Sequence, residues 1–203
     1  MSYPKTILNL IECYKRLPGI GEKTAERMAL ATLKFDEKTI NTFSESILNA
    51  KYKIKRCCIC NNYSEKDKCV ICNDDSRNKK IICVLEEPKN INTFEKMGGY
   101  EGVYHILNGL ISPLNGINPD DINLKSLFER VDNDGVSEII LAFKPSIEGE
   151  TTSLYISKML ENKNVTVSKI ASGVPMGTDL EYLDSMTLEM AFEDRKKISN
   201  NCN

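Results

Sequence analysis

The sequence has no tryptophan and a single histidine, His105, among its 203 residues. One histidine without an evident partner argues against Ser–His and Cys–His mechanisms, and His105 is expected to be an ordinary strand residue within "VYHIL". The lack of tryptophan leaves no obvious platform for stacking bases. Phe35 and Phe43 are expected in a core or an interface instead.

Long apolar segments are also missing. No run approaches the roughly 20 apolar residues that a membrane span needs, and the opening residues 1–4 lack the apolar core of a signal peptide. A G-x-x-x-x-G-K-[ST] motif for nucleotide phosphates is absent as well. We therefore expect a cytosolic protein.

The net charge of −2 hides an asymmetry along the chain. Residues 1–80 contain 16 Lys and Arg against 10 Asp and Glu, whereas residues 81–203 contain 11 against 19. A basic first part favours a polyanionic partner, and an acidic second part favours a different one. Two solvated surfaces of opposite sign would give the same counts.

The local pattern changes near residue 80. Before it, apolar residues recur at helical spacing in segments 5–17 and 22–34, and Asp36 is placed to cap a third helix that runs to about residue 54. One face of the second helix is predicted to carry Ala25, Met28, Ala29 and Leu33.

After residue 80, short apolar segments alternate with helical ones. Strands are predicted over 81–87, 103–107, 137–143 and 165–171, and helices over 89–97, 122–131, 149–162 and 184–194. The expected fold class is α/β. A helical module and a cysteine-rich module come first, and a mostly parallel sheet flanked by helices on both faces follows.

Five of the eight cysteines fall between residues 57 and 72. Cys57 and Cys60 form one C-x2-C pair, and Cys69 and Cys72 form a second after eight intervening residues. Two such knuckles can converge into a tetrahedral thiolate site, and the polar loop between them has no core of its own. The sequence predicts one structural Zn²⁺, with an iron–sulfur cluster as the alternative. Cys58 could replace Cys57 by a register shift, although C-x-C is the poorer spacing.

The segment "LPGIGEKTAERMA", residues 17–29, is typical of a helix–hairpin–helix. Gly19 and Gly21 allow a sharp turn that leaves amide groups exposed ahead of the second helix. Such amides can hold a phosphate without reading a base. Lys23 and Arg27 would extend that contact, and Lys34 is expected on the same side. An αα-corner with exposed charges is the alternative.

The second part of the chain resembles a Toprim domain, the fold shared by topoisomerases, primases and some nucleases. In that family a Glu ends the first strand, and a D-x-D motif followed by E-G-E ends a later one. Here Glu86 ends "IICVLE", while "KPSIEGE" puts Lys144 and Ser146 in place of the two Asp. A cation at that position opposes Mg²⁺ binding. This departure from the family pattern at Lys144 and Ser146 disfavours the alternative function, a Mg-dependent nuclease or topoisomerase-like enzyme.

The order of the parts resembles the RecR family of bacterial recombination mediators over roughly residues 3–198. The motifs that carry this resemblance include "SPLNGINPDDI", "PSIEGETT" and "GVPMGTDLEYLDSMTL". It implies a non-enzymatic, cytoplasmic and nucleoid-associated protein that works with RecO, and often RecF, to load RecA onto single-stranded DNA. It also implies ring-like tetramers that can encircle duplex DNA.

The resemblance further implies four regions and a role for particular residues. The regions are a helix–hairpin–helix module at 1–55, a zinc finger at 56–78, a Toprim domain at 79–172 and a C-terminal segment at 173–203. The implied DNA contacts are Gly19, Gly21, Lys23 and Arg27, the implied zinc ligands are Cys57, Cys60, Cys69 and Cys72, and the implied contacts with RecO are Glu148 and Glu150. Asp184 falls in a stretch described as Walker-B-like, but a helix N-cap is the simpler interpretation.

Overall fold

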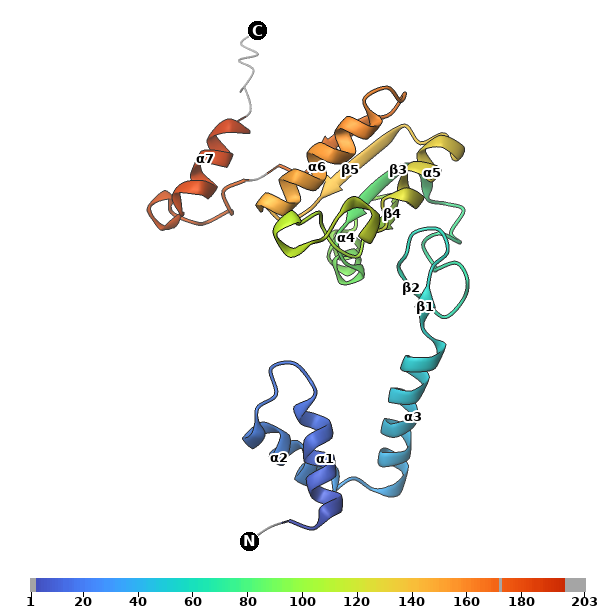
Figure 1. The fold of residues 1–203 in the computed structure, drawn as a ribbon, viewed down its shortest axis with the longest axis vertical. Coiled ribbons are helices and arrows are strands. Elements are labelled where there is room, and N and C mark those ends of the chain that lie inside the picture. The colour runs from blue at the N-terminus through green and yellow to red at the C-terminus, as the bar shows by residue number, and fades with distance from the viewer. Residues whose placement is uncertain (1–2, 172, 196–203) are drawn as a thin grey trace. The chain divides into compact units, whose positions relative to one another are not determined.

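The computed structural model describes residues 3–171 and 173–195, which form two compact units (Figure 1). The first unit ends at Ile54 and the second begins at Lys55. Each unit is described by itself. Among the residues that the structure describes, no helix combines the length and the apolar character that crossing a membrane requires.

The first unit consists of helices α1 (Lys5–Lys15), α2 (Glu22–Thr32) and α3 (Glu37–Lys53). Ala25 and Ala29 of α2 are fully buried against α1, where Ile11 is also buried. Because alanine has only a methyl group, it lets the two helix backbones approach closely. The hydroxyl groups of Tyr14 and Thr32 lie 2.6 Å apart and join the ends of the two helices.

The prediction for Leu33 was wrong. Its side chain is 57% exposed, and Thr32 is buried instead. Leu33 is the C-cap of α2, and its N–H still donates to the carbonyl oxygen of Ala29 at 3.3 Å, but the described residues leave its side chain uncovered. Thr32 takes up the space through its contact with Tyr14 and a hydrogen bond from its hydroxyl to the carbonyl oxygen of Met28.

Helix α3 begins as predicted, with the carboxylate of Asp36 accepting a 2.8 Å hydrogen bond from the backbone N–H of Thr39. None of its side chains is buried within the described residues. Phe35 and Phe43 pack edge to face with ring centroids 6.2 Å apart. The helix therefore presents apolar side chains, among them Phe43, Ile47 and Leu48, that the described unit does not cover.

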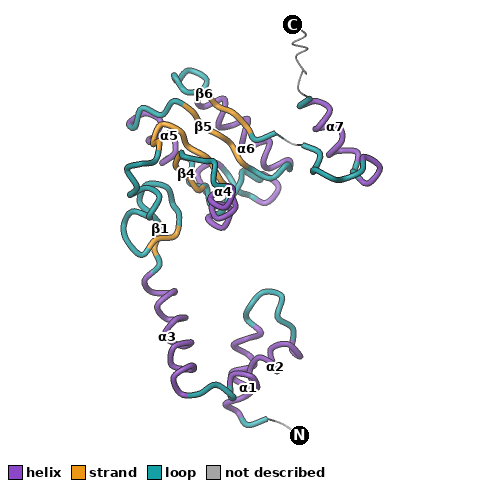
Figure 2. The backbone as a smooth tube through the Cα atoms, turned by 180° about the vertical axis from the view of Figure 1, so that it is seen from behind, coloured by secondary structure: helices purple, strands orange, loops and turns teal. Residues whose placement is uncertain are grey.

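The second unit contains the predicted parallel sheet (Figure 2). Its strands are β3 (Asn78–Leu85), β4 (Gly102–Ile106), β5 (Glu138–Ala142) and β6 (Thr166–Lys169), in the spatial order β4-β3-β5-β6. Every neighbouring pair is parallel. The central strands are apolar and buried on both faces, as a covered parallel sheet requires.

Helices cover both faces of this sheet, which confirms the predicted fold class. They are α4 (Ile91–Met97), α5 (Lys125–Asn133) and α6 (Ile147–Leu160), with short 3-10 turns at Pro88–Asn90, Pro113–Asn115, Pro119–Asp121 and Leu180–Tyr182. The last helix, α7 (Ser185–Glu193), buries none of its residues and covers neither face. Successive residues of a strand point to opposite faces. Accordingly, Tyr104 packs against Phe94 of α4, whereas His105 contacts Arg130 of α5.

The cysteine module lies against the edge strand β4. Its own short strands, β1 (Lys55–Arg56) and β2 (Tyr63–Ser64), pair antiparallel. The backbone N–H of Ile106 donates to the carbonyl oxygen of Cys60 at 2.9 Å, and the side-chain amide of Asn61 donates to the carbonyl oxygen of Ile106 at 3.2 Å. The cysteines belong to the same buried cluster as the strand residues, so the module and the sheet share one core.

His105 is fully buried between the sheet and α5. Its Nε2 lies 2.8 Å from the carbonyl oxygen of Asn123, and its Nδ1 lies 3.3 Å from Nη1 of Arg130. These contacts suit a neutral ring that donates from Nε2 and accepts at Nδ1. Burial lowers the pKa of His105 to about 4. The hydrogen bond with Asn123 opposes that change, and the nearby charge of Arg130 adds to it.

This buried histidine predicts a loss of stability in mild acid. Between pH 6.5 and about 4, His105 is protonated in the unfolded chain but stays neutral in the folded chain. The contribution to stability is complete above pH 6.5 and falls as the pH drops through this window, by about 2 kcal/mol between pH 7 and pH 5. Urea unfolding at the two pH values, with zinc in excess, measures the change. His105→Gln is the control, and an equal pH dependence in both proteins would refute the assignment.

Candidate functional site

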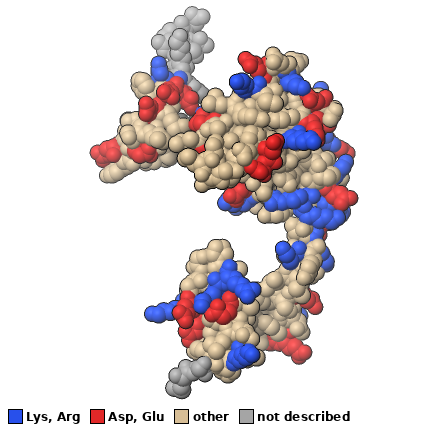
Figure 3. All heavy atoms as spheres, in the orientation of Figure 1, with Lys and Arg blue, Asp and Glu red and all other residues tan. Residues whose placement is uncertain are grey.

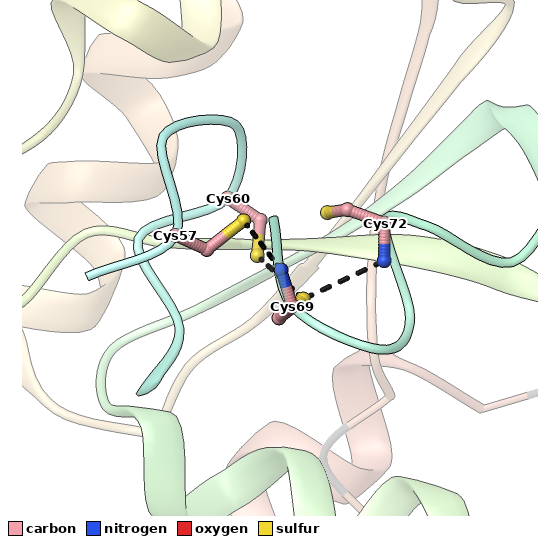
Figure 4. Close-up of side chains that lie close together, drawn as sticks. All are labelled: Cys57, Cys60, Cys69 and Cys72. Carbon is pink, nitrogen blue, oxygen red and sulfur yellow. Dashed lines mark hydrogen bonds between the residues drawn. The ribbon is translucent and has the colours of Figure 1, made fainter. Parts of the chain in front are cut away.

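The sulfur atoms of Cys57, Cys60, Cys69 and Cys72 all lie within 4.8 Å of one another (Figure 4). Those of Cys60 and Cys69 are 3.5 Å apart, and all four residues are buried. In a tetrahedral site with metal–sulfur bonds of about 2.3 Å, the sulfur atoms would be about 3.8 Å apart. The four thiols therefore fit a structural metal ion with a closed coordination shell.

The backbone of the two knuckles holds the sulfur atoms in place. The N–H of Cys69 donates to Sγ of Cys57 at 3.3 Å, and the N–H of Cys72 donates to Sγ of Cys69 at 3.5 Å. Asn61 has a φ of +62°, which turns the first knuckle back on itself. Cys58 is exposed and lies outside the cluster, so the structure selects the register that contains Cys57.

The cluster holds protons that a metal ion has to displace. The hydrogen bond with Cys69 and a second one with Cys72 raise the pKa of the Cys60 thiol, and burial raises it further. Metal ions bind the thiolate form of cysteine. Loading of this site therefore releases protons and becomes weaker as the pH falls.

A second group of polar residues lies at the carboxyl ends of the strands. Glu86 follows β3, and Lys144 follows β5, so their side chains meet at one edge of the sheet. Nζ of Lys144 is 3.8 Å from Oε1 of Glu86, whose side chain is 23% exposed. An ammonium group thus stands beside the carboxylate that a Toprim metal site would use. Lys144 thus brings a positive charge to the place that the sequence predicted for it, beside Glu86.

Helix α6 begins tightly at this edge. The hydroxyl of Ser146 accepts a 3.1 Å hydrogen bond from the N–H of Gly149 and caps the helix. A Cβ atom at Gly149 would lie 2.4 Å from the carbonyl oxygen of Lys144, so the close turn requires glycine. Glu148 lies in the first turn of α6. Its own backbone N–H and the hydroxyl of Ser146 lower the pKa of its carboxyl group, and Lys144 adds to the effect.

The two glutamates at this helix start differ in their surroundings. Nζ of Lys169, at the end of β6, lies 2.9 and 3.1 Å from the two carboxylate oxygens of Glu150. Glu148 makes no ion pair within the described parts of the chain. Sequence reasoning missed Lys169. The available signal was its position at the end of a predicted parallel strand, because such ends gather at one edge of a sheet.

The hairpin of the first unit has an open surface. Gly19 has a φ of +79°, and Gly21 precedes α2 without any side-chain cap. A Cβ atom at either glycine would meet nothing within 4 Å. The first amides of α2 therefore remain free to bind an anion.

Two cations extend this surface along α2. Lys23 and Arg27 are exposed and lie four residues apart, on one side of the helix. In the described part of this unit, neither pairs with a carboxylate, since the ion pair found there joins Lys15 and Glu12. The structure thus brings two free cations to the end of α2 that follows the open hairpin.

Asp184 is a helix cap, the simpler of the two interpretations. Its carboxylate accepts from the backbone N–H of Thr187 at 2.9 Å and from the hydroxyl of Thr187 at 2.6 Å, which starts α7. Both carboxylate oxygens are thus used within the first turn of the helix.

Three family models match this chain, in the order helix–hairpin–helix, Toprim domain and C-terminal segment. Family models described as "RecR, helix-hairpin-helix", "Toprim domain" and "RecR, C-terminal" match residues 7–51, 80–171 and 173–196. The fold and its sites thus define a recombination protein that combines a helix–hairpin–helix domain with a Toprim domain.

Two full-length relatives make the assignment specific. The chain is 44% identical to "Recombination protein RecR" of Natranaerobius thermophilus over 197 residues, which cover 97% of this chain and 99% of the relative. It is 45% identical to the protein of the same name from Lactobacillus helveticus over 196 residues, which cover 96% and 98%. The chain belongs to the RecR family.

The cysteine cluster leads to a prediction with an internal control. Cys57→Ser should abolish metal binding and lower the melting temperature strongly, because Cys57 lies in the core that the module shares with the sheet. Cys58→Ser should keep the metal and the melting temperature, because Cys58 is exposed one position along the chain. Elemental analysis and thermal melts distinguish the two variants. Equal metal loss in both would contradict the assigned register.

Proposed function

We propose that this chain is a non-enzymatic DNA-binding mediator of recombination and repair. In this proposal it acts with RecO, and with RecF, to promote the loading of RecA onto single-stranded DNA. Membership of the RecR family supports the general role. The observation that carries DNA binding is the open hairpin, where an uncapped helix start lies next to two unpaired cations.

The proposed DNA contact consists of Gly19, Gly21, Lys23 and Arg27. The glycines leave room for a phosphate to reach the first amides of α2, and the positive end of the helix favours its charge. The two cations bind neighbouring phosphates. Because none of these groups reads a base edge, binding is independent of sequence and depends strongly on salt.

We also propose that the chain assembles as a ring-shaped homotetramer that clamps DNA. In support, α3 leaves Phe43, Ile47 and Leu48 at least 40% exposed, and α7 leaves Met186 and Phe192 exposed. Apolar side chains left uncovered in this way favour contacts with other copies of the chain. An assembly would combine several weak phosphate contacts through effective concentration.

The four cysteines are proposed to hold one Zn²⁺ per chain. Four buried thiols at tetrahedral spacing suit zinc, and a closed shell suits a structural role. The proposed division of the chain is the one expected from its sequence: 1–55, 56–78, 79–172 and 173–203. We place the protein in the cytoplasm, at the nucleoid, because thiols of this kind persist in reducing compartments and its proposed ligand is DNA.

We propose no catalytic activity for this chain. The strand-end carboxylate Glu86 faces the ammonium group of Lys144, and Glu150 is held by Lys169. Two-metal phosphoryl transfer needs carboxylates that are free to bind cations. The edge of the sheet instead suits protein docking. Glu148 and Glu150 are the proposed contacts with RecO, and Glu148 is the more available of the two.

The DNA contact can be tested by replacing both cations of the hairpin. Lys23→Ala/Arg27→Ala should weaken binding to any sequence, and the slope of log K against log salt should fall by about 2 for two lost phosphate contacts. Fluorescence anisotropy over a salt series measures both quantities. Lys5→Ala/Lys38→Ala removes the same charge from the same unit away from the hairpin and should change little. Equal effects of the two pairs would exclude the hairpin.

The docking role makes a separate prediction. Glu148→Gln should weaken binding to RecO by roughly tenfold or more, because a charged partner group loses its counterpart. Glu150→Gln should have a smaller effect, since Lys169 already neutralises this carboxylate. Glu161→Gln, at the other end of α6, serves as the control. Calorimetry measures the affinities. Unchanged affinity in Glu148→Gln would remove this surface from the proposal.

A further inference from the structure

The cysteine module carries a patch of cations around an exposed tyrosine. The patch consists of Arg56 on β1, Tyr63 on β2, and Lys66 and Lys68 in the following loop. Arg56 and Tyr63 are direct partners in the β1–β2 ladder. Basic side chains gather over this module in the space-filling view (Figure 3). The patch belongs to the second unit and is separate from the hairpin of the first.

Arg56 is fixed in place without being neutralised. Its Nη1 donates to the carbonyl oxygen of Asn61 at 3.0 Å, and its Nη2 donates to the side-chain oxygen of Asn108 at 2.8 Å. The guanidinium lies 4.5 Å from the centre of the Tyr63 ring. All of these partners are uncharged, and no carboxylate of the described chain pairs with Arg56. Its position is set before any ligand arrives, and its charge remains available.

Tyr63 is 56% exposed, although burial of an aromatic ring is favourable. The turn after it is folded back by Ser64, whose hydroxyl accepts from the N–H of Lys66 at 3.1 Å and donates to the carbonyl oxygen of Lys68 at 3.2 Å. These two hydrogen bonds fix the backbone of the turn that carries both lysines. Neither lysine forms an ion pair within the described residues, and Lys55 neutralises Asp67 at 3.2 Å. Glu65 is the other acidic residue of the turn, beside the paired Asp67.

We propose that this patch binds single-stranded nucleic acid. An unpaired base stacks on the exposed part of the Tyr63 ring, and Arg56, Lys66 and Lys68 contact the phosphates on either side. Exposed aromatic rings beside cations are the combination that binds single strands without regard to sequence. The bases of a duplex are already stacked on one another, so the patch discriminates against duplex DNA.

This inference rests on the proposed DNA-binding function and adds a preference to it. The hairpin offers only phosphate contacts, which single and double strands share. The patch adds a contact that requires an unpaired base. A chain with both surfaces is suited to places where duplex DNA meets a single strand.

The test compares Tyr63→Ala with Tyr63→Phe in the full-length, zinc-loaded protein. Tyr63→Ala should weaken binding to oligothymidine by roughly 5- to 150-fold, the range for loss of one stacked base. It should leave binding to a duplex of equal length within about twofold, because a duplex offers no unpaired base to Tyr63. Tyr63→Phe keeps the aromatic face and should bind like the parent protein. Unchanged affinity of Tyr63→Ala for oligothymidine overturns the proposal.

A second measurement protects the test against misfolding of the variant. An oligonucleotide containing 5-iodouracil is irradiated with the unaltered protein, and the crosslinked peptide is identified by mass spectrometry. A crosslink at Tyr63 supports the proposal, and crosslinks confined to the hairpin overturn it. The proposal is also overturned if the protein binds an acidic peptide in preference to oligothymidine. The same holds if Tyr63→Ala changes the mass of the oligomer but keeps its affinity for oligothymidine. If Lys23→Ala/Arg27→Ala fails to weaken duplex binding while Tyr63→Ala behaves as expected, the hairpin proposal fails and the patch remains.

Discussion

The convergence of four sulfur atoms at Cys57, Cys60, Cys69 and Cys72 is the constraint on which the second unit depends. The intervening loop is polar and cannot form a core, so the sulfur atoms must be held together for the module to fold. Their burial is continuous with that of β3 and β4, and the carbonyl oxygen of Cys60 receives the N–H of Ile106. The same fold fixes the turn that presents Arg56 and Tyr63. The convergence of the thiols, the stability of the sheet and the proposed ligand surface are therefore coupled.

Charge in this unit differs between two surfaces. At the carboxyl ends of the strands, Lys144 and Lys169 form ion pairs with Glu86 and Glu150. On the cysteine module the reverse holds, because Arg56 is satisfied only by neutral groups. A half-buried cation with a carboxylate partner serves structure, as Arg77 does with Glu95. A fixed cation without one remains free to act on a ligand.

Local sequence signals predicted the helices, the strands and the parallel sheet, because apolar periodicity and capping residues act over a few positions. The spacing of the cysteines likewise predicted which residues would meet. Contacts between distant segments could not be predicted in this way. The pairing of Lys169 with Glu150 depends on strand order, and the choice of Cys57 over Cys58 depends on which side chain faces the sheet. Leu33 was predicted on the face of Ala25 and Ala29, but burial there depends on α1, where Tyr14 meets Thr32 and the side chain of Leu33 is left exposed.

The hydrogen bond between Ile106 and Cys60 bears on how the protein could aggregate. Strand β4 is an outer strand of the sheet, and an uncovered outer strand is a template for pairing with another chain. The cysteine module covers the end of that edge at Ile106, whereas the opposite outer strand, β6, is only four residues long and ends in a lysine. Oxidation of the thiols would therefore do more than loosen a small module. It would uncover the longer sheet edge and convert a local chemical lesion into aggregation.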